Sequence, residues 1–192
     1  RTEFQNFLIN LHFMAPVEFV PLAPFTSFGV ESTARYFSSF KDSLELEELL
    51  DWGQQYSLLI LGGGSNLLLT RDFDGLVLKN EISGIIELHE DNEYVYVKAG
   101  AGENWHRFVL YCIERNWAGL ENLSLIPGSV GASPMQNIGA YGVEVEDLFW
   151  DLEAWHIGEK RIVTFTNNDC RFGYRESVFK HKYKGQFVIL NV

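Results

Sequence analysis

The residues with the clearest chemical potential are Gly62-Gly63-Gly64-Ser65-Asn66, which follow an apolar run of strand length. Consecutive glycines remove side-chain cover and allow positive φ angles, so backbone N–H groups can converge on an anion. The motif is not the dinucleotide fingerprint, because Leu67 stands at the third glycine position, and it is not a P-loop, because no Gly-Lys-Ser/Thr follows. The pattern predicts either a phosphate-binding loop or a tight turn between two strands.

A second glycine-rich segment spans residues 127–142 and contains no charged residue. Small, uncharged residues in such a run favour a backbone that lies against a flat or elongated ligand. The same residues would also suit a close crossing of two lobes, so both interpretations stay open at this point.

Composition narrows the class of function. The 192 residues carry a formal net charge of −11 at pH 7, which argues against nonspecific binding to nucleic acid or to an anionic membrane surface. The sequence has no apolar run of the roughly 18 residues that a membrane span needs. Its two cysteines lack C-x-x-C spacing and its five histidines form no ligand pattern, so neither a disulfide nor a metal site is predicted. These features favour a reducing cytoplasm.

The elements that must position the two glycine clusters are helices and strands in mixed order. Helices are predicted over residues 43–56, with Ser43 as N-cap, and over residues 104–115. Cys112 lies on the apolar face of the second helix, which predicts core packing and not a nucleophile. The order lacks strict βαβ alternation, so an α+β fold is predicted. Strands are predicted at residues 57–61, 76–78, 85–88, 94–98, 148–156, 161–165 and 186–192.

The N-terminal region contributes little to this pattern. Met14-Ala15-Pro16 forms a more natural start than Arg1, so residues 1–13 are interpreted as a possible tag or upstream segment and excluded from fold reasoning. Pro21 and Pro24 predict an extended arm and not a helix.

Four motifs occur together in a recognisable order and spacing. They are residues 62–66, residues 100–105 (Gly-Ala-Gly-Glu-Asn-Trp), residues 126–142, and residues 170–177 (Cys-Arg-Phe-Gly-Tyr-Arg-Glu-Ser). In this order they resemble the UDP-N-acetylenolpyruvoylglucosamine reductase family, flavoenzymes that make UDP-N-acetylmuramate for bacterial cell walls. The resemblance runs from about Pro21 to Val192.

The resemblance implies a two-lobed α+β FAD-binding module of the vanillyl-alcohol-oxidase (PCMH) type, with lobe 1 at residues 14–80 and lobe 2 at residues 81–192. Neither glycine cluster contains His or Cys, so FAD is expected to bind noncovalently. Gly63→Val is expected to weaken FAD binding more than it destabilises the fold. The backbone of Gly62, Gly63, Gly64, Ser65 and Asn66 would hold the FAD pyrophosphate, and the rest of the cofactor would contact Pro127, Gly128, Gly131, Ala132, Ser133, Gln136, Asn137, Gly139 and Tyr141.

Tyr174 and Arg175 match a Tyr-Arg pair that faces the substrate in this family. The resemblance therefore implies that Arg175 is catalytic, because a fixed guanidinium can neutralise the carboxylate charge that develops when hydride adds to an enolpyruvyl double bond. Taken without the motif, the residues favour a surface Arg175 paired with Glu176. The implied hydride donor is NADPH, and the implied substrate partner is a UDP-sugar enolpyruvyl ether.

The family pattern also includes a third domain, with a serine that donates a proton and a glutamate that assists the arginine. The chain is therefore expected to be the FAD-binding portion of a longer enzyme, with little turnover by itself. The alternatives are a catalytically incomplete FAD-binding module and another flavin oxidoreductase of the same superfamily. The sequence predicts no oligomeric state.

Overall fold

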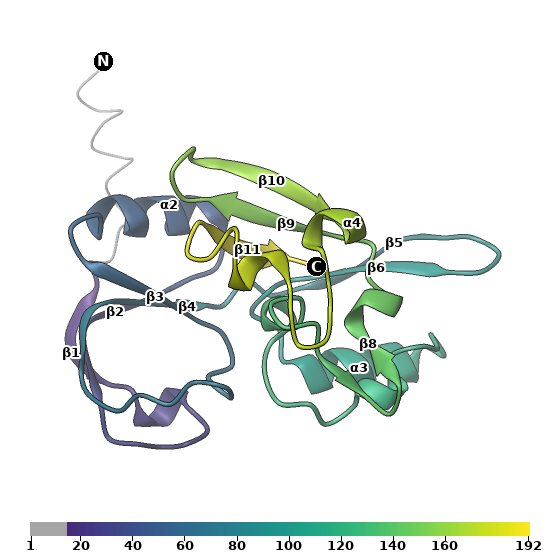
Figure 1. Cartoon of the computed structure of the whole chain (residues 1–192), viewed down its shortest axis with the longest axis horizontal. Helices are drawn as coiled ribbons and strands as arrows, with labels where there is room; N and C mark the ends of the chain where they lie inside the picture. Colours follow the sequence, from purple (N-terminus) through teal and green to yellow (C-terminus); the bar gives the residue numbers. More distant parts are fainter. Residues whose placement is uncertain (1–14) are drawn as a thin grey trace, which may run out of the picture.

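The computed structural model describes residues 15–192, so the predicted start at Met14 and the segment over residues 1–13 lie outside the described residues. Three parts follow one another along the chain (Figure 1): a sheet with one helix, a long hairpin with a second helix, and a sheet that lies against both. No described helix is long and apolar enough to cross a membrane.

The first sheet contains four strands in the order β1-β2-β4-β3: β1 (Val17–Pro21), β2 (Thr33–Phe40), β4 (Phe73–Asn80) and β3 (Ser57–Leu61). β1 pairs antiparallel with β2, whereas β2 and β3 both pair parallel with β4. The predicted strand at residues 57–61 is confirmed, and the one at residues 76–78 is the middle of a longer strand. Strand β2 was not predicted. The predicted N-terminal arm contains β1 and the short 3₁₀ turn η1 (Ala23–Phe25).

Helix α2 (Ser43–Trp52) connects β2 to β3, which makes a parallel crossover. It ends four residues before the predicted limit at residue 56. Its N-cap is Asp42 and not Ser43, because the Asp42 carboxylate accepts hydrogen bonds from the backbone of Leu44 and Glu45 at 2.9 Å. Leu46 and Leu49 are the buried residues of this helix.

The second part is an antiparallel hairpin followed by a helix. Strands β5 (Ile85–Glu90) and β6 (Val95–Ala99) pair as predicted and extend away from the first sheet (Figure 1). Helix α3 (Trp105–Glu114) begins after Asn104, whose side chain caps Arg107 at 3.0 Å. Cys112 lies on the buried face of this helix and is part of the core, as its apolar spacing predicted.

The third part is a sheet in the order β10-β9-β11, with β9 (Asp151–His156), β10 (Arg161–Thr166) and β11 (Phe187–Asn191) all antiparallel. The predicted hairpin around Gly158 and the C-terminal strand are confirmed. Short elements complete the chain: β7 (Gly139–Ala140), β8 (Val143–Glu144), α4 (Asn167–Cys170), and the 3₁₀ turns η2 (Glu121–Leu123), η3 (Val130–Ala132), η4 (Val145–Asp147) and η5 (Val178–Lys180).

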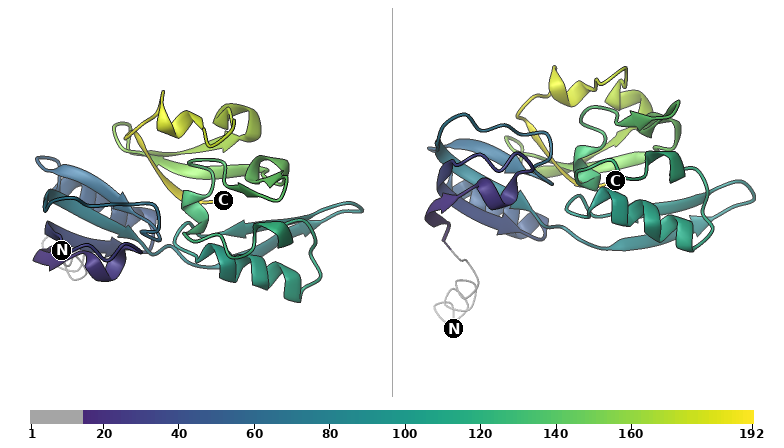
Figure 2. Two further views of the ribbon diagram at one scale, coloured as in Figure 1. Left: turned by 60° about the horizontal axis from the view of Figure 1, so that its bottom comes forward. Right: turned by 90° about the horizontal axis from the view of Figure 1, so that it is seen from below.

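The β9–β11 sheet joins the other two parts. Figure 2 shows the first sheet and the α3 region side by side, with the third sheet above both. Trp155 and Val188 share a buried cluster with Phe40 and Leu46 of the first part. At the other end of the sheet, the backbone of Ala99 exchanges two hydrogen bonds with that of Val192.

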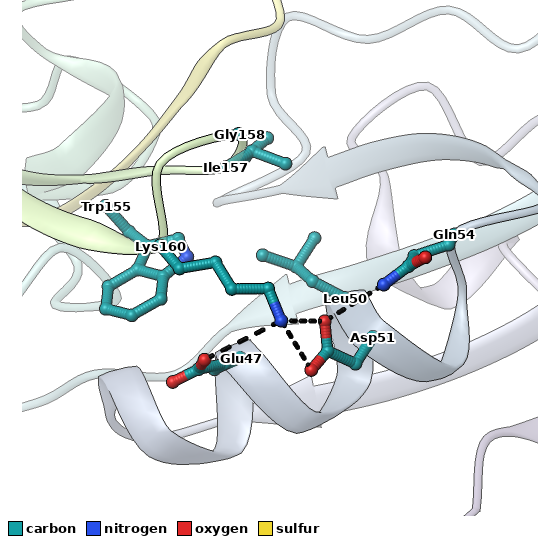
Figure 3. Close-up of a pocket in the computed structure, with 8 residues that line it drawn as sticks. All are labelled: Glu47, Leu50, Asp51, Gln54, Trp155, Ile157, Gly158 and Lys160. Carbon is teal, nitrogen blue, oxygen red and sulfur yellow. Dashed lines mark hydrogen bonds and ion pairs between the residues drawn. The ribbon is translucent and has the colours of Figure 1, made fainter.

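A shallow pocket of about 250 Å³ lies between α2 and the β9–β10 turn (Figure 3). There Lys160 Nζ contacts both carboxylate oxygens of Asp51 at 2.6 and 2.7 Å, and lies 3.9 Å from Glu47. This ion pair ties the first part of the chain to the third. The pocket contains no residue of either glycine cluster.

Candidate functional site

The first glycine cluster belongs to a long crossover, so the tight-turn interpretation is wrong. Residues 62–72 connect β3 to β4, and these two strands are parallel neighbours. Parallel neighbours cannot be joined by a tight turn, because the chain must return to the start of the sheet. Gly64 has a φ of +65°, which glycine adopts without steric cost.

The backbone N–H groups of this loop are free to bind a ligand. Within residues 15–192, those of Gly63, Gly64, Ser65 and Asn66 donate no hydrogen bond, although Gly64 is buried. Unpaired N–H groups at a buried position are costly unless a ligand or water accepts from them. Consecutive free donors in a turn form an anion-binding concavity, and no acidic residue lies in residues 62–66 or 127–142. The loop therefore fits a pyrophosphate group.

The two glycine clusters lie directly against each other. A Cβ atom on Gly62 would lie 2.6 Å from Ser129 Oγ, and one on Gly63 would lie 2.8 Å from Gly128 Cα. The side chains of Asn66 and Gln136 are joined by a 3.1 Å hydrogen bond. These glycines thus serve a close crossing as well as any ligand, so Gly63→Val is expected to destabilise the fold in addition to weakening FAD binding.

A third segment closes the loop from the side of the N-terminal arm. The Gly64 carbonyl accepts a 3.1 Å hydrogen bond from Ser27 N, and a Cβ atom on Gly64 would overlap the Phe25 carbonyl. Sequence reasoning missed this contact, because no pattern in the arm indicates a partner so far along the chain. Ser129 was also missed as a partner of Gly62, although it lies within the second cluster.

The structure separates the predicted cofactor residues of the second cluster into two groups. Ser133 and Asn137 are buried, and their side chains bond within the protein: Ser133 Oγ donates to the Val130 carbonyl at 2.7 Å. These two side chains support the segment and do not form its surface. The residues of the cluster with exposed surface are Pro127, Ala132, Met135, Tyr141 and Gly142; Gly128, Gly131, Gln136 and Gly139 are partly exposed.

Tyr174 and Arg175 occupy the tip of a turn beside β7 and β8. Gly173 and Glu176 close this turn through backbone hydrogen bonds of 3.0 and 3.2 Å, and Arg175 has a φ of +56°. Both residues line a pocket of about 230 Å³ together with Gly139, Ala140, Gly142, Val143 and Glu144. The predicted Arg175–Glu176 pair is wrong, because Glu176 binds Lys180 at 3.3 Å and also contacts His181. Arg175 forms no ion pair with another described residue.

Two carboxylates lie near this pocket. Glu144 lines it, and the neighbouring Glu146 has a pKa raised above its ordinary value, first by burial and then by Glu144. Across the described part of the chain, no group of three or more His, Cys, Asp or Glu side chains is arranged to hold a metal ion. Burial raises the pKa of the Cys112 thiol to about 11 and that of Cys170 to about 12, which fits core packing.

Comparison with known proteins bears on this arrangement. The family described as FAD binding domain matches residues 36–157. The chain is 51% identical over 177 residues to the UDP-N-acetylenolpyruvoylglucosamine reductase of Amoebophilus asiaticus, covering 91% of this chain and 52% of that protein. The resemblance derived from the four motifs is thereby confirmed. The chain spans about half the length of the curated relatives it matches.

Solved structures show the fold. The chain resembles UDP-N-acetylenolpyruvylglucosamine reductase from Thermus caldophilus with a TM-score of 0.73 at 24% identity, covering 94% of this chain and 61% of that one. It resembles p-cresol methylhydroxylase with a TM-score of 0.57 at 10% identity, covering 85% and 35%. These likenesses confirm the predicted α+β fold of the PCMH type.

The match over residues 36–157 also confirms FAD as the predicted cofactor. It includes the glycine loop and the second cluster, which lie against each other at the free N–H groups, together with the hairpin and α3 between them in the sequence. Because this match covers more than half of its residues, the chain belongs to the FAD binding domain family.

Proposed function

We propose that this chain is the FAD-binding part of an NADPH-dependent reductase that converts UDP-N-acetylenolpyruvoylglucosamine into UDP-N-acetylmuramate. The observation that carries the proposal is the 51% identity to the Amoebophilus asiaticus reductase, which extends over 91% of this chain. Since the chain spans about half of that protein, the reaction is proposed for the whole protein and the cofactor-binding role for this chain. The reaction belongs to peptidoglycan precursor synthesis, and hence to cell shape and division, in the cytoplasm.

We assign the FAD pyrophosphate to the four free backbone donors of residues 63–66, with the second glycine cluster along the rest of the cofactor. Neither cluster contains a His or Cys that could form a covalent flavin bond, so binding is noncovalent. When bound, FAD supplies the hydride chemistry that no amino-acid side chain provides. The division into lobes at residue 80 is part of the same proposal.

Arg175 supplies the electrostatic part of the reaction. Hydride addition to an enolpyruvyl double bond places charge on the substrate carboxylate, and a guanidinium that is already in place stabilises this charge without reorganisation. Arg175 fits this role because it has no ion-pair partner among residues 15–192 and lies beside the second glycine cluster. Tyr174, which is 83% exposed at the same tip, forms the other side of the substrate contact.

The test uses the protein expressed from the complete reading frame and loaded with FAD. It follows the NADPH oxidation that depends on the enolpyruvyl substrate. We expect Arg175→Lys to lower kcat by at least about 10-fold, because lysine keeps the charge and loses the planar fork. Arg171→Lys is the matched control, since Arg171 is also exposed and has a positive φ of +47°.

Three outcomes are informative. Turnover that falls with Arg175→Lys and stays unchanged with Arg171→Lys supports the proposal. A protein that binds FAD but gives no substrate-dependent oxidation is an FAD-binding module without this activity. Oxidation of a different substrate, with Arg175→Lys unchanged, assigns the chain to another oxidoreductase of the superfamily.

A further inference from the structure

The turn that carries Tyr174 and Arg175 has little support of its own. Its tip side chains are exposed, two backbone hydrogen bonds between Gly173 and Glu176 close it, and Lys180 Nζ from η5 donates to the Arg175 carbonyl at 2.7 Å. A four-residue turn of this kind, with a non-glycine residue at positive φ, persists only when its surroundings hold it. The position of the Arg175 guanidinium is therefore set by whatever fixes the two ends of the turn.

Both ends are fixed to the second glycine cluster by buried side chains. At the first end, Asn137 Nδ2 donates to the Gly173 carbonyl at 3.3 Å. At the other end, Ser177 Oγ donates to the Met135 carbonyl at 2.7 Å. Asn137 is fully buried and Ser177 is 2% exposed, so water does not compete for these bonds.

Each of these two side chains is itself held in place. Asn137 Nδ2 also donates to Glu144 at 2.7 Å, and Asn137 Oδ1 accepts from Glu146 N at 3.0 Å, so the amide has one orientation that satisfies both ends. Ser177 Oγ accepts from Phe179 N at 3.3 Å and so caps the following 3₁₀ turn η5. Asn137 and Ser177 are therefore each held in place by further hydrogen bonds, and each in turn fixes one end of the turn.

We infer that Ser177 and Asn137 are positioning residues that fix Arg175 relative to the cofactor-binding segment. The inference rests on the proposed function of Arg175 and extends it to residues that do not contact the substrate. The bond partners of the turn, Met135 and Asn137, lie in the same segment that follows the crossing with the glycine loop. The Asn137 and Ser177 bonds thus connect the turn to the cofactor-binding segment, whereas the Lys180 bond holds its tip from η5.

The test is a double-mutant cycle in the complete, FAD-loaded protein. Ser177→Ala removes the hydroxyl without adding bulk, and we expect it to lower kcat/KM for the enolpyruvyl substrate, toward the roughly 100-fold loss that a misplacement of about 1 Å can cause. In an Arg175→Lys background, the same change is expected to lower kcat/KM by less than about 2-fold, because the group that it positions is already gone. Ser32→Ala is the control, since Ser32 is a buried serine outside the site whose hydroxyl has no partner among the described residues.

A second readout does not depend on activity. Trypsin cleaves after exposed arginines, so release of the turn in Ser177→Ala is expected to speed cleavage after Arg175 several-fold, while cleavage after Arg107 on α3 stays unchanged. Fragments are quantified by mass spectrometry.

The outcomes separate this inference from the proposed function. An equal loss of kcat/KM in both backgrounds, or no loss where Arg175→Lys alone is impaired, overturns the positioning role. No faster cleavage after Arg175 also overturns it. An unimpaired Arg175→Lys protein instead overturns the catalytic role of Arg175.

Discussion

Replacing Gly63 with alanine tests why the first loop consists of glycines. A Cβ atom at Gly63 would lie 2.8 Å from both the Cα and the carbonyl carbon of Gly128, whereas carbon atoms are at their optimal separation at about 3.5–4.0 Å. Both atoms of Gly128 belong to the backbone, so no rotation of a side chain relieves the contact. The two segments must move apart by roughly 0.7 Å, the difference between these separations.

The cost follows from this displacement. Overpacking in a fixed environment costs about 1–3 kcal/mol, and Gly63 is exposed on its other side, so the loop can yield outward. We expect the free energy of unfolding to fall by about 1–2 kcal/mol, which corresponds to a fall in Tm of about 2–8 °C for a chain of this length. The same movement displaces the free N–H groups, so FAD affinity is expected to fall about 10-fold, or roughly 1.4 kcal/mol.

The assay compares urea unfolding of the FAD-free protein and FAD titration for the parent and two variants. Gly158→Ala is the matched control, because its Cβ would meet only the His156 ring, with Cε1 at 3.5 Å and Nδ1 at 3.7 Å, which are ordinary distances. Both variants change the entropy of the unfolded chain alike. If Gly63→Ala unfolds at the same urea concentration as Gly158→Ala and binds FAD as the parent does, the close crossing does not require the glycine.

Two further predictions concern other parts of the chain. Lys160 lowers the pKa of Asp51. The carboxylate therefore contributes stability above its unfolded pKa of about 3.9, and this contribution is lost as pH falls through the lower folded pKa. We expect Lys160→Met to have a lower unfolding free energy than the parent at pH 7, and the difference to shrink toward pH 3, as measured by urea titrations at both pH values. Cys112 and Cys170 are buried with raised pKa values of about 11 and about 12, so a thiol reagent at pH 7.5 should label them only in urea, and fast labelling of the folded protein would contradict their burial.

Local signals were sufficient for several elements. Helix α3 was predicted within one residue at each end, because its apolar spacing and its cap at Asn104 agree. Strand β2 was missed, because its sequence Thr-Ala-Arg-Tyr-Phe-Ser-Ser-Phe has no clear alternation and its partner β4 begins at Phe73. The pairing of β2 with β4 is a long-range fact that local patterns do not contain.

The candidate site shows the same limit. The glycine runs indicated where the backbone makes a close contact, but they did not indicate whether the contact is with a ligand or with the other glycine cluster. At Gly63 the backbone lies against Gly128 of the second cluster. Polar residues in an irregular segment have no period that separates inward from outward side chains. Asn137 was therefore interpreted as a cofactor contact, although its side chain bonds to Glu144 and Gly173 inside the protein.

The most direct measurement is the release of flavin from the purified chain. The protein is titrated with FAD to high concentration, freed of excess and precipitated with acid, and the absorbance of supernatant and pellet is recorded. We expect yellow FAD in the supernatant, since the free N–H groups of residues 63–66 bind it without a covalent bond. Colour retained in the pellet would contradict noncovalent binding, and a protein that stays colourless throughout the titration would contradict the cofactor site itself.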